Sequence, residues 1–385
     1  GYDRKNLKIP QNQEELLAEI AETVGKDHIA AISFGGAPMD FSFEKNVGAI
    51  LHMYLGGQAV GESVADLISG EVNPSGKLAE TIPFSEKDTP AWRYFAPPND
   101  DVEYRESIFV GYRYYETFHV PVKYPFGYGL SYTSFSYSEL NVPEVYSGGK
   151  IQIRFKIKNI GKVSGAEIAQ LYVCPIESDV IRSHIELKGF QKIYLHPGEE
   201  KEVILELDER SFSVYDVEKK AFSMLSGKYQ ICIGASVHDL QLKANMEVVG
   251  NSYFRNEREL FPDYFREQPH GMEISAEQFY QLLGGEPKHD KEKKRGEYTV
   301  YDSYQDVVNV SMFGKIVRGV VHIGLKIILR GKSERDPAFK MVKMGVEEGN
   351  LEGLIATSGG IATPKLIDML VTMQIKNICR LLNDC

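Results

Sequence analysis

Residues 47–83 read VGAILHMYLGGQAVGESVADLISGEVNPSGKLAETIP, and this stretch decides the fold of the chain. An apolar run over residues 49–55 stops at Gly56-Gly57, and a short helical pattern follows it. Residues 73–76, Asn-Pro-Ser-Gly, predict a tight turn, because proline presets φ while asparagine and glycine tolerate positive φ. Residues 77–83 then predict a last short strand. This order of strand, glycine-rich loop, helix, turn and strand is typical of an α/β sheet.

The residues before this stretch predict one more helix and one more strand. Apolar side chains recur on one face of a helix that ends at Gly25. Residues 28–34 form a run of small apolar side chains, which predicts a strand buried on both faces of a sheet. So few strands cannot cover both faces of a parallel sheet alone. We therefore predict the C-terminal half of an α/β sandwich, over residues 1–90.

Several motifs in this region resemble those of one enzyme family. They are Gly56-Gly57-Gln58, Asn73-Pro74-Ser75-Gly76-Lys77-Leu78 and Thr81-Ile82-Pro83. Together, and in this order, they resemble the C-terminal α/β-sandwich domain of glycoside hydrolase family 3, the β-glucosidase and β-xylosidase family. The family usually has Asn-Gly-Ser-Pro followed by a tryptophan further upstream. This chain has Gly35-Gly36-Ala37-Pro38 and Phe43 instead, so the resemblance assigns no sugar contact to that loop.

The first residues of the chain bear on the catalytic site that the resemblance implies. Gly1-Tyr2-Asp3-Arg4 resembles the family motif Glu-Gly-(Tyr/Phe)-Asp-Arg, whose glutamate is the general acid/base in many bacterial members. The resemblance places that glutamate immediately before Gly1, and the nucleophilic aspartate in an N-terminal barrel domain that the sequence lacks. No catalytic residue is then expected within the chain. Asp3 and Arg4 are candidate near-active-site residues that orient the glutamate, and a salt bridge at a helix entry is the structural alternative.

Residues 91–135 form an aromatic connector. The strings YRESIFVGYRYYE (residues 104–116) and YPFGYGLSYTSF (residues 124–135) resemble the family's bridge between its α/β sandwich and the β-sandwich that follows. Aromatic rings can stack on sugars, or they can anchor a linker because each ring buries a large area. We favour the structural interpretation. Arg105 and Arg113 are accordingly expected to bind carboxylates or carbonyls inside the interface between these two domains, not substrate.

Residues 136–249 predict a β-sandwich. Apolar and polar side chains alternate strictly over residues 151–158, as in a half-buried strand. Similar patterns recur at residues 169–173, 203–207 and 229–233, with Pro-Gly or Ser-Gly turn signals between them. Regular short strands of this kind indicate an immunoglobulin or fibronectin type III-like sandwich. The strings LKGFQKIYLHPGEEKEVILELD and SGKYQICIGAS resemble the family's fibronectin type III-like domain.

The remaining residues predict a linker with a short helix (250–300) and a helical tail (301–385). Within the tail, Lys315, Arg318, His322 and Lys326 form one stripe of an otherwise apolar segment, residues 312–332. These charges disfavour a transmembrane helix. A basic amphipathic helix could lie on a membrane surface or dock on the acidic protein body. We expect docking on the body, and therefore no membrane partner.

Composition excludes several classes of function. The net charge of −10 and the pI near 5.5 argue against nucleic-acid binding. The four cysteines show no CxxC pair, which favours a reducing, cytoplasmic location. The scattered histidines of the sandwich indicate no metal site, and we expect no cofactor.

The sequence thus predicts a multidomain α/β plus all-β chain with a helical C-terminal tail. The resemblance implies the C-terminal portion of a retaining β-glycosidase, β-glucosidase-like or β-xylosidase-like, which hydrolyses terminal non-reducing β-linked sugars of an oligosaccharide or glycoside. The missing N-terminal barrel is its expected partner, and the chain alone is expected to be inactive. The alternative is a non-catalytic carbohydrate-binding or adhesion module with a β-sandwich.

Overall fold

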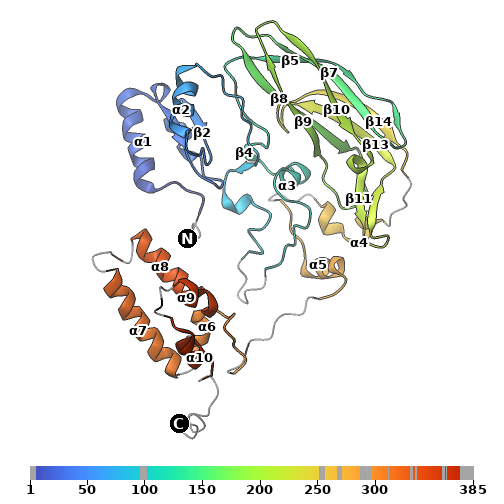
Figure 1. Cartoon of the computed structure of the whole chain (residues 1–385). Helices are drawn as coiled ribbons and strands as arrows, with labels where there is room; N and C mark the ends of the chain where they lie inside the picture. Colours follow the sequence, from blue (N-terminus) through green and yellow to red (C-terminus); the bar gives the residue numbers. More distant parts are fainter. Residues whose placement is uncertain are drawn as a thin grey trace. The chain divides into compact units, whose positions relative to one another are not determined.

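The structure is a computed structural model that describes residues 6–95, 102–250, 256–266, 271–286, 293, 296–310, 312–329, 333, 336–357, 360 and 362–372. The chain divides into two compact units. One comprises residues 6–287 and contains the α/β part, the connector and the β-sandwich. The other, the helical unit, contains the described residues between 293 and 372. Figure 1 shows the elements of each unit in sequence colours.

The α/β part contains α1 (Gln11–Val24), β1 (Ala30–Ser33), β2 (Ala49–His52) and α2 (Val60–Ser69). β1 and β2 pair in parallel, with Ala30 opposite Ala49. A small core lies beneath them and is centred on Met39, Phe41, Phe43, Val47 and Ile82. The expectation that residues 28–34 form a strand buried on both faces was wrong: Ile32 and Phe34 are exposed.

The strand predicted over residues 77–83 is much shorter than expected. β3 comprises only Ile82–Pro83 and pairs antiparallel with β4 (Val122–Tyr124), and not with the β1–β2 sheet. The connector therefore closes onto the α/β part. Glu44 reinforces this closure, because its carboxylate binds the Lys123 ammonium and accepts a 2.5 Å hydrogen bond from the Tyr124 hydroxyl. Burial raises the pKa of Glu44, but these two bonds outweigh it and lower the pKa below its usual value.

The connector forms an aromatic core of its own. Its helix α3 (Tyr112–Thr117) packs with the 3-10 helix η5 (Pro262–Phe265) and with α5 (Ala276–Leu283), and α4 (Glu257–Leu260) directly precedes η5. The buried members of this core are Phe109, Tyr114, Tyr115, Phe118, Phe261, Tyr264, Met272, Ile274 and Phe279. The structural interpretation is confirmed for the four connector aromatics of this core, Phe109, Tyr114, Tyr115 and Phe118. The range that the sequence assigned to a linker, 250–300, thus supplies apolar side chains to a core.

The β-sandwich has the predicted strands. One sheet has the order β10-β7-β5, and the other β6-β14-β13-β8-β9. The long strands are β5 (Phe135–Asn141), β7 (Ile151–Asn159), β8 (Gly165–Pro175), β9 (Glu186–Leu195), β10 (Glu200–Leu207), β13 (Gly227–Gly234) and β14 (Leu240–Val248), with the short β6 (Val145–Tyr146) at an edge. β11 (Ser213–Asp216) and β12 (Ala221–Met224) form a separate hairpin. Alternate side chains such as Ile153, Phe155 and Ile157 are buried, because successive residues of a strand point to opposite faces.

The helical unit contains α6 (Tyr304–Asn309), α7 (Met312–Ile328), α8 (Pro337–Glu347), α9 (Leu351–Thr357) and α10 (Pro364–Thr372). Its core centres on Tyr304, Val307, Val308, Leu351, Leu354, Ile367 and Leu370. Val317 and Val321 of α7 pack against this core, so α7 is part of a helical bundle. A second apolar stripe of α7 remains exposed, formed by Met312, Ile316, Val320, Ile323 and Ile327. In the described part of the chain, no helix is long and apolar enough to cross a membrane.

Candidate functional site

The two predicted near-active-site residues, Asp3 and Arg4, lie outside the described residues. β1 and β2 pair in parallel, so their carboxyl ends lie side by side at one edge of the sheet. That edge is where open α/β sheets place their ligand sites. It is therefore the part of this chain from which a site would be built.

Ser33 and His52 end these two strands and lie opposite each other. The Ser33 Oγ and the His52 Nδ1 are 2.9 Å apart. A serine beside a histidine can form a nucleophile–base pair. Such a pair needs a third group that orients the imidazole. No described residue provides that group, because His52 Nε2 is buried without a hydrogen-bond partner among them. Burial lowers the pKa of His52, so the ring is held as a neutral side chain.

The His52 ring lies among aromatic side chains. Its centroid is 4.1 Å from that of Tyr54, and it meets Phe41 edge-on. Tyr54 has φ 49, a left-handed conformation that few non-glycine residues adopt. Burial, followed by the charge of Glu80, raises the pKa of Tyr54 to about 12, and burial also raises the pKa of Glu80. This cluster is a packed, polar edge of the sheet, and we assign it a structural role.

Sequence reasoning missed this cluster. A signal for it exists: a polar residue interrupts each apolar run at the end of its strand, Ser33 in AAISF and His52 in AILHM. The loop after β1 departs from the family pattern in sequence. Phe43, which occupies the region where the family usually has a tryptophan, is 3% exposed and belongs to the core below the sheet.

The Asn73-Pro-Ser-Gly turn joins the α/β part to the connector. The Asn73 Oδ1 accepts hydrogen bonds from the Tyr132 backbone N–H at 2.8 Å and from the Ser131 hydroxyl at 3.0 Å. Its Nδ2 donates to the Ser164 carbonyl at 3.0 Å. Three segments far apart in the sequence are therefore held by one amide side chain.

Replacing Asn73 with alanine is expected to lower the free energy of unfolding by about 2 kcal/mol, because three groups, two of them in partly buried hydrogen bonds, lose their partner. Urea denaturation followed by circular dichroism measures the change. The matched control is Asn141→Ala, an exposed residue on β5, for which a change within about 0.5 kcal/mol is expected. Equal effects of the two substitutions would contradict the role of Asn73.

The following residues of the motif meet the FGYG segment of the connector. Leu78 N–H donates to the Tyr128 carbonyl, and Gly127 N–H donates to the Leu78 carbonyl, both at 2.8 Å. A Cβ at Gly129 would lie 2.3 Å from the Gly76 carbonyl oxygen, so this close approach requires glycine. Lys77 extends further and binds Glu167 of β8 at 3.0 Å, in a buried ion pair. The motif at residues 73–78 and the FGYG segment at residues 126–129 thus form the two sides of one junction.

The arginines of the connector bind as expected. Arg105 contacts the Glu103 carboxylate at 2.5 Å and donates to the Ile274 carbonyl at 3.0 Å. Arg113 lies 3.9 Å from the Glu186 carboxylate. Among the described residues, no group of histidine, cysteine, aspartate and glutamate side chains is arranged to hold a metal ion.

Comparisons with known proteins agree with this architecture. The model of the glycosyl hydrolase family 3 C-terminal domain matches residues 1–132, and that of the fibronectin type III-like domain matches residues 167–237. The chain is 44% identical over 250 residues to "Thermostable beta-glucosidase B" of Acetivibrio thermocellus. The aligned region covers 64% of this chain and 33% of that protein. Residues 1–132 belong to the C-terminal domain of glycosyl hydrolase family 3.

Other family members show the same partial coverage. The chain is 36% identical over 251 residues to "Exo-alpha-(1->6)-L-arabinopyranosidase" of Bifidobacterium breve, covering 65% of this chain and 33% of that protein. The crystal structure of the family 3 β-glucosidase of Bifidobacterium adolescentis superposes with a TM-score of 0.62 and 36% identity, covering 66% of this chain and 37% of that one. The chain therefore spans about a third of the length of these relatives. Both matched family models end before the helical unit begins.

Proposed function

We propose that this chain is the C-terminal portion of a retaining β-glycosidase that hydrolyses terminal non-reducing β-linked sugars, with β-glucosides as its principal class of substrate. The observation that carries the proposal is the 44% identity over 250 residues to a family 3 β-glucosidase. The structure supports it with the junction between Asn73, Lys77 and the FGYG segment, which joins the two matched domains in residues 6–287.

In a retaining mechanism, one carboxylate attacks the anomeric carbon while a carboxylic acid about 5–5.5 Å away protonates the leaving oxygen. Water then releases the sugar. We place the nucleophilic aspartate in an upstream barrel domain, and the acid/base glutamate next to Gly1. Asp3 and Arg4 would orient that glutamate. The described residues would have a structural role and would not contact the reacting atoms. They hold the α/β part, the connector and the β-sandwich in one unit.

The proposed partners follow from this mechanism. They are a β-linked oligosaccharide or glycoside and the upstream barrel domain, without a cofactor, nucleic acid or membrane. We also propose a cytoplasmic location. Two cysteines of neighbouring strands support it, because Cys174 and Cys232 are free thiols with their sulfur atoms 3.8 Å apart.

The test is an assay of nitrophenol release from aryl β-glucosides and β-xylosides. We expect the purified chain to show no turnover, because loss of either catalytic carboxylate costs several orders of magnitude in rate. We expect the same chain extended upstream through a barrel domain to hydrolyse the β-glucoside. Saturable turnover by the chain alone would refute the placement of both carboxylates. An extended protein that binds glycosides without hydrolysing them would favour the carbohydrate-binding alternative.

A further inference from the structure

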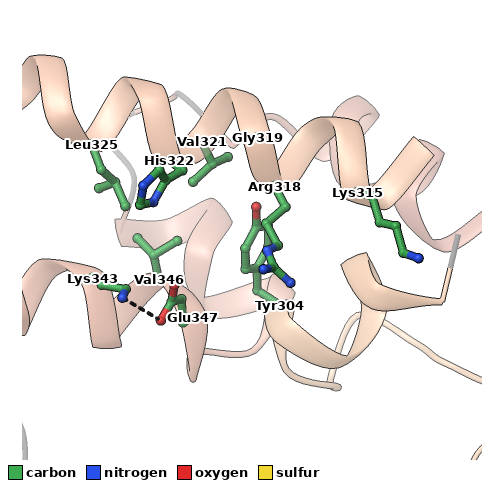
Figure 2. Close-up of a pocket in the computed structure, with 10 residues that line it drawn as sticks. All are labelled: Tyr304, Lys315, Arg318, Gly319, Val321, His322, Leu325, Lys343, Val346 and Glu347. Carbon is green, nitrogen blue, oxygen red and sulfur yellow. Dashed lines mark ion pairs between the residues drawn. The ribbon is translucent and has the colours of Figure 1, made fainter. Parts of the chain in front are cut away.

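The helical unit contains a cavity of about 620 Å³ between α7 on one side and α6 and α8 on the other. Ten residues line it: Tyr304, Lys315, Arg318, Gly319, Val321, His322, Leu325, Lys343, Val346 and Glu347. Figure 2 shows that the side chains of α7 and α8 face each other across this space. Its volume is within the range of small-molecule sites, about 300–1,000 Å³. Both matched family models end before these helices, so the proposed glycosidase function does not account for the cavity.

The lining is positively charged although the chain as a whole carries a net charge of −10. Lys343 lies 3.9 Å from the Glu347 carboxylate, the acidic group among the lining residues. Arg318 donates a 2.8 Å hydrogen bond to the neutral amide of Asn309, which fixes the guanidinium but leaves its charge uncompensated. Lys315 has no ion-pair partner among the described residues. The cavity therefore retains two fixed positive charges.

Besides the ion pair and the two cations, further side chains complete the lining. His322, like Lys315, has no hydrogen-bond partner among the described residues. The Tyr304 hydroxyl points toward α7 in Figure 2 and is buried without a partner among those residues. Burial raises the pKa of Tyr304 to about 12, so this hydroxyl remains a donor at neutral pH. Val321, Leu325 and Val346 supply an apolar wall.

We propose that this cavity binds a small organic phosphate monoester. A phosphate monoester carries a charge of about −1.5 to −2 near neutral pH, which matches the two uncompensated cations. The planar fork of Arg318 suits two phosphate oxygens, and Lys315 adds a point charge. The apolar wall would contact the organic group. A concave, partly apolar site favours a discrete small molecule over the flat surface of a membrane.

The experiment is titration of the full chain with phenyl phosphate, followed by isothermal calorimetry and by ³¹P line width. We expect saturable binding with a Kd below about 1 mM, weakened by added salt. Benzoate, a monoanion with the same ring, should have a Kd at least about tenfold higher than that of phenyl phosphate. Arg318→Gln should weaken phenyl phosphate binding about tenfold or more. Tyr304→Phe should weaken it without altering net charge.

The matched control is Lys326→Gln, which removes the same charge from an exposed residue of α7 that does not line the cavity. Its Kd should stay within about twofold of the unaltered chain. Circular dichroism at 222 nm confirms that each variant is folded. Equal weakening by Arg318→Gln and Lys326→Gln would overturn the site, because it would show only general attraction to a basic helix. Co-flotation with phosphatidylglycerol vesicles without binding of phenyl phosphate would also overturn it, in favour of a lipid surface on the exposed apolar stripe.

Discussion

Replacing Lys77 with methionine is expected to lower the free energy of unfolding by about 3–5 kcal/mol, because the substitution leaves a buried carboxylate unpaired. The Lys77 ammonium lies 3.0 Å from Glu167 Oε1, and these side chains are only 11% and 7% exposed. The ammonium also donates to the Gly129 carbonyl at 3.0 Å. Urea denaturation followed by circular dichroism and by tyrosine fluorescence measures the change.

Two controls distinguish the effect of burying the Lys77–Glu167 pair from the effect of removing one positive charge. Lys150→Met removes the partner of Glu206 in an ion pair of 3.2 Å whose side chains are 74% and 54% exposed. It should cost less than about 1 kcal/mol, because solvent screens an exposed pair. Lys77→Met combined with Glu167→Leu should recover most of the loss, since a buried ion pair is often replaced by apolar side chains at little cost. A Lys77→Met variant no less stable than Lys150→Met would contradict the role of this pair.

Replacing Phe155 with alanine is expected to lower the free energy of unfolding by about 3–5 kcal/mol, the usual cost of removing a buried aromatic ring. Phe155 is 1% exposed and lies on β7, within the core between the two sheets of the sandwich. The loss combines the transfer free energy of the ring with the cavity left behind. Urea denaturation of the full chain measures it.

Phe190→Ala is the matched control, because Phe190 lies on β9 of the same sandwich and is 66% exposed. It should change the free energy of unfolding by no more than about 0.5 kcal/mol. Comparable losses for the two variants would mean that residues 136–249 do not form the independent core that the sheets indicate.

The β-sandwich was the part most open to prediction from sequence. The inward row of Ile153, Phe155 and Ile157 alternates with polar side chains, and the same period marks the buried side chains of β10. A period of two defines both the strand and its buried face without knowledge of any partner. The short helix capped at Ser275 was also predictable, because the serine accepts the Gln278 N–H and Gly284 ends the helix. These signals act within a few residues of one another.

The pairing of distant segments could not be predicted in this way. Residues 77–83 predict a strand of the α/β sheet, yet β3 pairs with the connector, 40 residues further along the chain at Val122–Tyr124. Strand partners depend on which edges and faces remain open, and local pattern does not contain that information. The polar edge of Ser33, His52 and Tyr54 was missed for the same reason, since it exists only where two strand ends meet.

The sequence by itself determined the strands of the β-sandwich and the two domain types that the family models match, because alternation, turn chemistry and family motifs are all local properties of the chain. It also determined the basic stripe of α7 from its spacing. The tertiary structure alone decided what those residues face. It placed Lys77 against Glu167, and Lys315, Arg318 and His322 along a cavity opposite Lys343. The physical reason is that burial and charge compensation depend on neighbours brought together by packing, which no spacing along one segment specifies.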